Sequence, residues 1–295
     1  MKKIYNYTTK QGVRLRRLGV HTSIANGIHL SLERAEALGC STVQIFSHNP
    51  RSWRVAPIAA DSLSKFKKLK RAHDIQPVYV HASYLINLAS ADRQVRGKSM
   101  RLLGQEMDRA DLLAADYVVL HTGSASKDDE ETARKRATEA LRTVSGQNRW
   151  KAGLLMENTA GERGDISSRI RDLAEIMDKT GGVLIGGICL DTCHAFQAGY
   201  EISKEEGVDE IAAEIVRYLG LEQVKLIHLN DAKRSFNARV DRHEHIGSGT
   251  IGTEGLAKFI NHPAFREVPL ILETPKKSEG DDPRNLKVVR RLFKP

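Results

Sequence analysis

The sequence predicts an α/β fold, a single-domain (β/α)8 barrel of the TIM class, on three observations. Eight short apolar segments alternate with amphipathic segments of helical periodicity. Hydrophobic residues make up 40% of the 295 residues but aromatic residues only 5%, and this aliphatic composition favours a buried parallel sheet over a β-sandwich. No Pro- or Ser-rich linker divides the chain. Barrels of this length commonly form one domain.

The eight apolar segments are the expected strands. They are residues 18–23, 42–47, 77–83, 117–123, 153–159, 187–192, 225–231 and 269–275. The segments between them carry apolar residues at helical spacing, as in 166–180, where Ile170, Leu173 and Ile176 recur. Right-handed crossovers make all strands parallel, so that their carboxyl ends open onto one face.

An open, doubly wound sheet is the structural alternative. That fold would use a Gly-rich phosphate-binding loop after the first strand, and residues 19–27, GVHTSIANG, contain no GxGxxG pattern. The expected organisation is therefore a basic extension over residues 1–17 and a barrel domain over residues 18–295.

The net charge of +9 favours an anionic partner, because Lys and Arg side chains that neutralise phosphates release counterions. A merely basic enzyme is the alternative on charge alone. The three cysteines have no paired spacing, which argues against a disulfide framework. The sequence shows neither a secretory signal nor the run of about 18 apolar residues of a membrane span. A cytoplasmic monomer is expected.

Titratable side chains end six consecutive predicted strands. They are His81, His121, Glu157, Asp191, His228 and Glu273. A single polar residue in such a place is most often a cap or a hydrogen-bonded residue of the barrel rim. Six at one end of a barrel would repel one another and lose hydration unless cations neutralised them. The pattern therefore predicts a metal centre.

Two loop motifs extend the predicted ligand set. In DTCH, His194 lies three residues after Asp191 and can fold back toward the same end of the barrel. In VDRHEH, Asp241 and His243 lie on one face of an extended segment. These nine ligands, with one bridging carboxylate, can serve three ions. Nitrogen and carboxylate donors suit Zn²⁺, with Mn²⁺ or Fe as alternative occupants.

Three other histidines are expected not to bind metal directly, two as residues of the barrel rim or partners of the ligands (His21 and His48) and one as a partner of the ligands (His245). The cysteines have no ligand spacing, and Cys189 is expected in the core.

The motifs together resemble the endonuclease IV family of abasic-site endonucleases, over about residues 18–275. The resemblance is carried by HASYLINLA (81–89), MENTAG (156–161), LDTCHAFQAGY (190–200), HLNDAK (228–233), VDRHEHIGSGTIG (240–252) and LILETP (270–275). It implies three zinc ions, which the predicted ligands divide between them. The first would be held by His81, His121 and Glu157, the second by Glu157, Asp191, His228 and Glu273, and the third by His194, Asp241 and His243.

The resemblance also implies side chains that penetrate DNA, namely Arg51 in HNPRSW and Tyr84 with Leu85 in ASYLINL. A planar or apolar wedge can replace an ejected nucleotide in the base stack. Ordinary loop packing is the alternative for each. Lys233, Arg234, Arg239 and Arg242 flank the DRH segment and are expected to meet phosphates or to form a solvated basic face.

The implied activity is metal-assisted hydrolysis of the phosphodiester 5′ to an abasic site, with Glu157 bridging metals and Glu273 orienting or deprotonating the attacking water. The implied products are a 3′ hydroxyl and a 5′ deoxyribose phosphate, and the same site would remove 3′ blocking groups. The basic extension and Pro50 in the HNPRSW loop depart from the family pattern, which leaves the mode of DNA penetration open.

Two other functions compete with this interpretation. A divalent-metal sugar isomerase or epimerase shares the strand-end Glu, Asp, His and Glu arrangement, but it needs neither the DRH segment nor a basic surface. A non-catalytic DNA-binding barrel would have no use for nine ligands.

Overall fold

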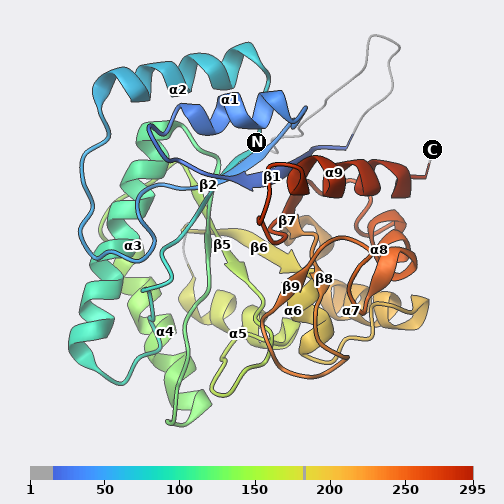
Figure 1. Cartoon of the computed structure of the whole chain (residues 1–295). Coiled ribbons are helices and arrows are strands. Elements are labelled where there is room, and N and C mark those ends of the chain that lie inside the picture. The colour runs from blue at the N-terminus through green and yellow to red at the C-terminus, as the bar shows by residue number, and fades with distance from the viewer. Residues whose placement is uncertain (1–15, 182–183, 295) are drawn as a thin grey trace.

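The structure, a computed structural model, describes residues 16–181 and 184–294. Residues 1–15 of the predicted extension lie outside the described residues. Within the described ranges, eight parallel strands form a closed barrel surrounded by helices (Figure 1), which confirms the predicted fold class. Neighbours around the barrel follow the chain order, and the last strand closes the ring by pairing with the first.

The barrel strands lie where the apolar segments predicted them. They are β1 (Leu18–Thr22), β2 (Val43–Phe46), β3 (Val78–His81), β4 (Tyr117–Leu120), β5 (Gly153–Glu157), β6 (Ile185–Asp191), β7 (Val224–His228) and β10 (Leu270–Leu272). Two further short strands, β8 (Asp231–Ala232) and β9 (His243–Glu244), pair antiparallel with each other outside the barrel.

The helices pack apolar faces against the barrel, as α5 does with Ile170, Leu173 and Ile176. They are α1 (Leu30–Ala37), α2 (Ala60–Ala72), α3 (Arg93–Leu113), α4 (Glu130–Ser145), α5 (Ile170–Thr180), α6 (Thr192–Gln197), α7 (Glu205–Tyr218), α8 (Gly252–Asn261) and α9 (Asp281–Leu292), with a 3-10 helix, η1 (Leu221–Gln223). In the part of the chain that the structure describes, none of them is both long and apolar enough to cross a bilayer.

A layer of buried side chains fills the middle of the barrel. Its members are Tyr79, Val119, Leu155, Cys189, Leu226 and Ile271. Each lies two residues before one of the six titratable residues that the sequence places at strand ends. Because alternate residues of a strand point to the same side, the titratable side chains lie directly above this layer, at the end of the barrel that we call the mouth.

The last two residues of the predicted extension pack on the barrel. The Arg16 guanidinium donates to the carbonyls of Ile260, Phe265 and Val268, at 2.6 to 2.7 Å. Arg17 is buried and pairs with Asp74 at 3.0 Å. These two arginines are therefore part of the barrel rather than of a separate segment.

Candidate metal centre

The mouth of the barrel brings the predicted strand-end side chains into two clusters that share one residue. In the first cluster, ligand atoms of His81, His121 and Glu157 all lie within 4.8 Å of one another. The Nε2 atoms of the two histidines lie 3.4 and 3.2 Å from Glu157 Oε2. All three donors point to one place.

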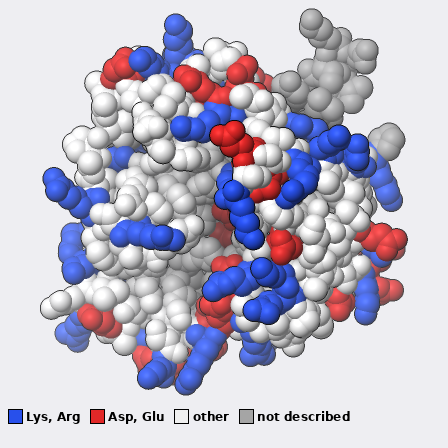
Figure 2. Space-filling view, in the orientation of Figure 1, with Lys and Arg blue, Asp and Glu red and all other residues white. Residues whose placement is uncertain are grey.

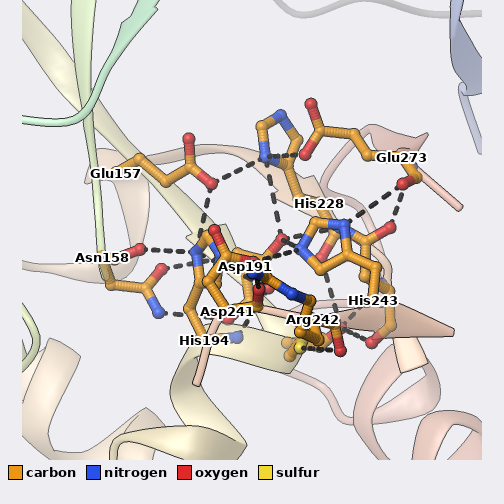
Figure 3. Close-up of polar contacts among 12 residues, drawn as sticks. Glu157, Asn158, Asp191, His194, His228, Asp241, Arg242, His243 and Glu273 are labelled. Carbon is orange, nitrogen blue, oxygen red and sulfur yellow. Dashed lines mark hydrogen bonds and ion pairs between the residues drawn. The ribbon is translucent and has the colours of Figure 1, made fainter. Parts of the chain in front are cut away.

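The second cluster comprises Glu157, Asp191, His228 and Glu273, again within 4.8 Å. His228 Nδ1 lies 3.0 Å from Glu157 Oε1 and 3.1 Å from Glu273 Oε2, and Figure 3 shows the two carboxylates on either side of this histidine. One oxygen of Glu157 therefore faces the first cluster and the other faces the second, so that this carboxylate belongs to both.

The third cluster comprises His194, Asp241 and His243, also within 4.8 Å. Asp241 Oδ1 lies 3.2 Å from His194 Nε2 and 3.4 Å from His243 Nε2. Asp191 caps the amino terminus of α6 by accepting the His194 backbone N–H at 2.8 Å. This cap turns the chain so that His194 returns to the mouth, which is the local reason for the DTCH spacing.

In three of the histidines, a hydrogen bond between Nδ1 and a backbone carbonyl determines that Nε2 is the nitrogen that faces a carboxylate. The Nδ1 atoms of His81, His194 and His243 lie 2.8, 2.9 and 3.2 Å from the carbonyl oxygens of Ala82, Asn158 and Glu273. A carbonyl only accepts, so each Nδ1 carries the proton. In its neutral form, each imidazole would then keep an Nε2 lone pair that points into its cluster, as in metal-binding histidines.

The charges of the mouth are strongly coupled. Burial lowers the pKa of His194, but the carboxylates of Asp191 and Asp241 outweigh this effect and raise it well above its ordinary value. Burial raises the pKa of Glu157, but the neighbouring imidazoles outweigh burial and hold the pKa well below the usual range. The Glu157 carboxylate is thus ionised, and it requires positive charge beside it, from protons on imidazoles or from cations.

The donor set fits metal ions. Glu157 Oε2, His194 Nε2 and His243 Nε2 are buried and have no hydrogen-bond partner among the described residues. A buried polar atom without a partner is costly, and coordination would remove that cost. Divalent transition metals are usually bound by imidazole nitrogens and carboxylate oxygens. The second nitrogen of each such imidazole is usually hydrogen-bonded to another group of the protein, as it is in His81, His194 and His243.

The residues predicted to penetrate DNA lie at the rim of the mouth. Tyr84 is 62% exposed, and its ring stands edge-on to Phe46 with 5.2 Å between centroids. Leu85 is half-buried beside it. Arg51 is exposed on the turn after β2, and its backbone N–H donates to Asn49 Oδ1.

Glu106 is a buried acidic residue of α3 that sequence reasoning missed. It connects the loop after β2, which carries Arg51, with the loop after β3, which carries Tyr84. Glu106 Oε1 accepts from the Ser83 backbone N–H at 2.8 Å and contacts His48 Nε2 at 3.1 Å. Ser83 Oγ in turn donates to the Pro50 carbonyl at 2.6 Å. His48 therefore supports the loop that carries Arg51 and contacts no ligand cluster. The feature of the sequence that could have identified Glu106 is a polar residue on the buried face of a helix.

Of the other two histidines that were expected not to bind metal, His21 contacts a predicted ligand and His245 does not. His21 Nδ1 is 3.5 Å from Glu273 Oε1 and 3.1 Å from the amide nitrogen of Gln44, a fully buried side chain that sequence reasoning also missed. Burial lowers the pKa of His21. His245 contacts Asn285 at 3.1 Å rather than a ligand.

Basic side chains line the segment between β8 and β9. Lys233, Arg234, Arg239 and Arg242 are all exposed there or partly so. In Figure 2, Lys and Arg side chains gather on both sides of a hollow in the face that the view presents. This distribution suits a polyanion lying across that face.

Asp231, the aspartate of HLNDAK, organises the loop after the DRH segment. Its buried carboxylate accepts backbone N–H groups from Gly247, Gly249 and Ile251 at 2.9 to 3.0 Å. Three backbone donors of one loop therefore share a single charged acceptor, and the conformation of the loop depends on this side chain.

We expect Asp231→Ala to lower the free energy of unfolding by about 3 to 5 kcal/mol, because several backbone N–H donors lose a buried, charged acceptor. Urea denaturation of the two proteins measures the difference. Asp61→Asn, an exposed position on α2, is the control and should leave the midpoint unchanged. A stability of Asp231→Ala equal to that of the wild type would contradict this role.

Comparison with known proteins agrees with this geometry. The family model described as a xylose isomerase-like TIM barrel matches residues 32–294. The probable endonuclease 4 of Halothermothrix orenii is 39% identical over 276 residues, which cover 93% of this chain and 99% of the relative. The probable endonuclease 4 of Aquifex aeolicus is 38% identical over 277 residues, or 93% and 97% of the two chains.

Solved structures distinguish family from fold. The crystal structure of endonuclease IV from Thermus thermophilus superposes with a TM-score of 0.82 at 36% identity, covering 94% of this chain and 98% of that one. A D-tagatose 3-epimerase-like protein superposes with a TM-score of 0.71 at only 18% identity, over 94% and 96% of the two chains, which shows a shared barrel alone. The chain therefore belongs to the endonuclease IV family and is a nuclease built on a (β/α)8 barrel.

Proposed function

We propose that this protein is a zinc-dependent abasic-site endonuclease of base excision repair. It would hydrolyse the phosphodiester 5′ to an abasic site, leave a 3′ hydroxyl and a 5′ deoxyribose phosphate, and remove 3′ blocking groups. The observation that carries the proposal is Glu157, shared by two ligand clusters at a mouth whose rim exposes Tyr84 and Arg51. A cytoplasmic monomer would suffice for this task.

The three clusters would each hold one ion. The nine proposed ligands are His81, His121, Glu157, Asp191, His194, His228, Asp241, His243 and Glu273. Divalent zinc held there, or Mn²⁺ or Fe at one site, would neutralise the phosphate and make water more acidic. The ligands do not need to move to form the clusters, because strand ends and short turns already hold them.

Glu273 is the proposed acid-base residue of the mouth. Burial raises its pKa, but the neighbouring imidazoles, His228 foremost, outweigh burial and hold the pKa well below the usual range, so the carboxylate is ionised. An ionised carboxylate can orient an attacking water and accept its proton. Its Oε1 atom is held by Gln44 at 2.6 Å, which limits rotation of the group.

Tyr84 lies between two cavities that border the clusters. One, of about 610 Å³, is lined by Glu273, His21 and Phe46, and the other, of about 260 Å³, by His121, His194 and Asp241. A nucleotide without a base costs less to extrude from the duplex, because it has lost stacking and pairing. The smaller cavity suits a sugar phosphate, and Tyr84 is placed to fill the gap left in the stack.

We expect Tyr84→Ala to weaken binding of an abasic duplex by about 5- to 150-fold, the equivalent of about 1 to 3 kcal/mol for one lost stacking partner. Binding and KM are measured with a duplex that carries one tetrahydrofuran site. Tyr84→Phe keeps the ring and serves as the control, with near-normal binding. Metal content should not change in either variant. Unaltered binding by Tyr84→Ala would exclude the wedge role.

A nicking assay on an abasic duplex tests the function directly. Zinc-loaded protein should cut this duplex on the 5′ side of the lesion and leave an intact duplex uncut. Conversion of ketoses without nicking would favour the sugar isomerase, and binding of the abasic duplex without nicking would favour the non-catalytic barrel.

A further inference from the structure

Gln44 is a polar side chain in the middle of an apolar strand. It lies in β2 between Val43 and Ile45, pairs in register with Tyr79 of the buried layer, and is completely buried. An uncharged amide at such a depth must satisfy two donors and one acceptor internally. Its partners therefore indicate what it does.

The amide is hydrogen-bonded at both ends to ligands of the second cluster. One end lies 2.6 Å from Glu273 Oε1 and the other lies 2.8 Å from His228 Nε2. The end beside a carboxylate oxygen must be the NH₂ group, because only that end donates. The carbonyl end then faces His228, and His228 Nε2 must carry the proton.

This assignment determines the metal-facing atoms of both ligands. With the proton on Nε2, the lone pair of His228 is on Nδ1, which lies 3.0 Å from Glu157 Oε1. With Oε1 of Glu273 engaged by Gln44, the other oxygen, Oε2, is the one that lies 3.1 Å from His228 Nδ1. One buried amide thus orients a ligand from β7 and a ligand that follows β10.

The group that orients the imidazole of His228 differs from the groups that orient three other histidines of the mouth. His81, His194 and His243 are each oriented by a backbone carbonyl, which no side-chain substitution removes. His228 is oriented by a side chain of another strand of the barrel. The second N–H of Gln44 is directed to His21 Nδ1 at 3.1 Å, so every polar group of the amide is used.

We propose that Gln44 is a positioning residue of the metal centre, which selects Nδ1 of His228 and Oε2 of Glu273 as the ligand atoms of the second cluster. The role rests on the proposed metal-dependent function. Gln44 itself contacts no ion in this scheme. Its loss should affect the second cluster first and leave the third, built from α6 and the segment around β9, in place.

Gln44→Met is the principal test, because methionine has a similar length and no strong hydrogen-bonding groups. We expect the variant to lose about one metal ion per chain after dialysis against a chelator. Nicking of an abasic duplex should fall by about 10- to 100-fold, the usual effect of losing an outer partner of a metal ligand. The loss should lie in kcat rather than in KM, because the rim residues are unchanged.

Gln44→Glu provides a second variant of the same size. Its carboxylate can accept from His228 but cannot donate to Glu273, and it adds a negative charge beside that carboxylate. We expect metal content and the visible spectrum of the cobalt-loaded protein to change in this variant too. Thr42→Val is the matched control: it removes a buried hydrogen bond to the Pro77 carbonyl just before β2, away from the ligands, and should retain all metal.

The outcomes distinguish the role of Gln44 from the proposed function. Wild-type metal content and wild-type nicking in a folded Gln44→Met or Gln44→Glu variant would overturn the role of Gln44 alone. A wild-type protein that holds no metal and does not nick would overturn both that role and the proposed function. Equal metal loss in Thr42→Val would reduce the effect to general destabilisation and would also reject the proposal.

Discussion

Replacement of Glu157 by Gln should reduce nicking of an abasic duplex by about a thousandfold or more, which corresponds to about 4 kcal/mol of barrier. The amide keeps the shape of the side chain but presents only one acceptor and no charge. Glu157 directs Oε2 to the first cluster and Oε1 to the second, so one substitution weakens two sites. Metal content should fall together with activity.

The measurement pairs metal per chain with single-turnover nicking at saturating enzyme. Glu106→Gln is the control for metal content, because it also removes a buried carboxylate but lies outside the three clusters. It should retain its metal. Full nicking activity in Glu157→Gln would exclude the bridging role, whatever its metal content.

Removal of metal by a chelator should abolish nicking and lower the melting temperature. Ions that bind only the folded chain stabilise it by about 4 kcal/mol at a thousand times their Kd. A chain of this size loses about 2 to 4 °C per kcal/mol, so we expect a fall of about 10 °C or more. Scanning calorimetry with and without chelator, followed by readdition of zinc, provides the measurement.

The pH dependence of this effect has a definite sign. In the absence of metal, the carboxylates of the mouth raise the pKa values of His81, His121, His194 and His228 despite their burial. Stability from their protonated forms is fully present below the ordinary pKa and is lost as pH rises through the raised pKa. Metal requires the deprotonated imidazole. The chelator should therefore lower the melting temperature more at pH 8 than at pH 6, and an equal fall at both would contradict the assignment.

The order of apolar and amphipathic segments in the sequence was sufficient to predict the (β/α)8 barrel. Alternation of apolar strands and amphipathic helices is a local property, and it located all eight barrel strands because a buried parallel strand has few alternatives to a continuous aliphatic run. The position of each titratable residue, two places after a buried residue such as Leu155 or Leu226, followed from the same period. Convergence at one end then required only that the strands be parallel.

Partnerships between distant side chains were decided only by the tertiary structure. Gln44 meets His228 across 184 positions of sequence, and Glu106 reaches Ser83 from the buried face of α3. Neither contact could be predicted from the periodicity of the sequence. The first depends on the stagger of the strands in the closed barrel, and the second depends on how α3 packs against it. The sequence by itself determined which side chains reach the mouth, through the spacing of titratable residues along the strands. Closure of the barrel determined which atom of each side chain faces the others, because the direction of a hydrogen bond depends on neighbours that only the folded chain brings together.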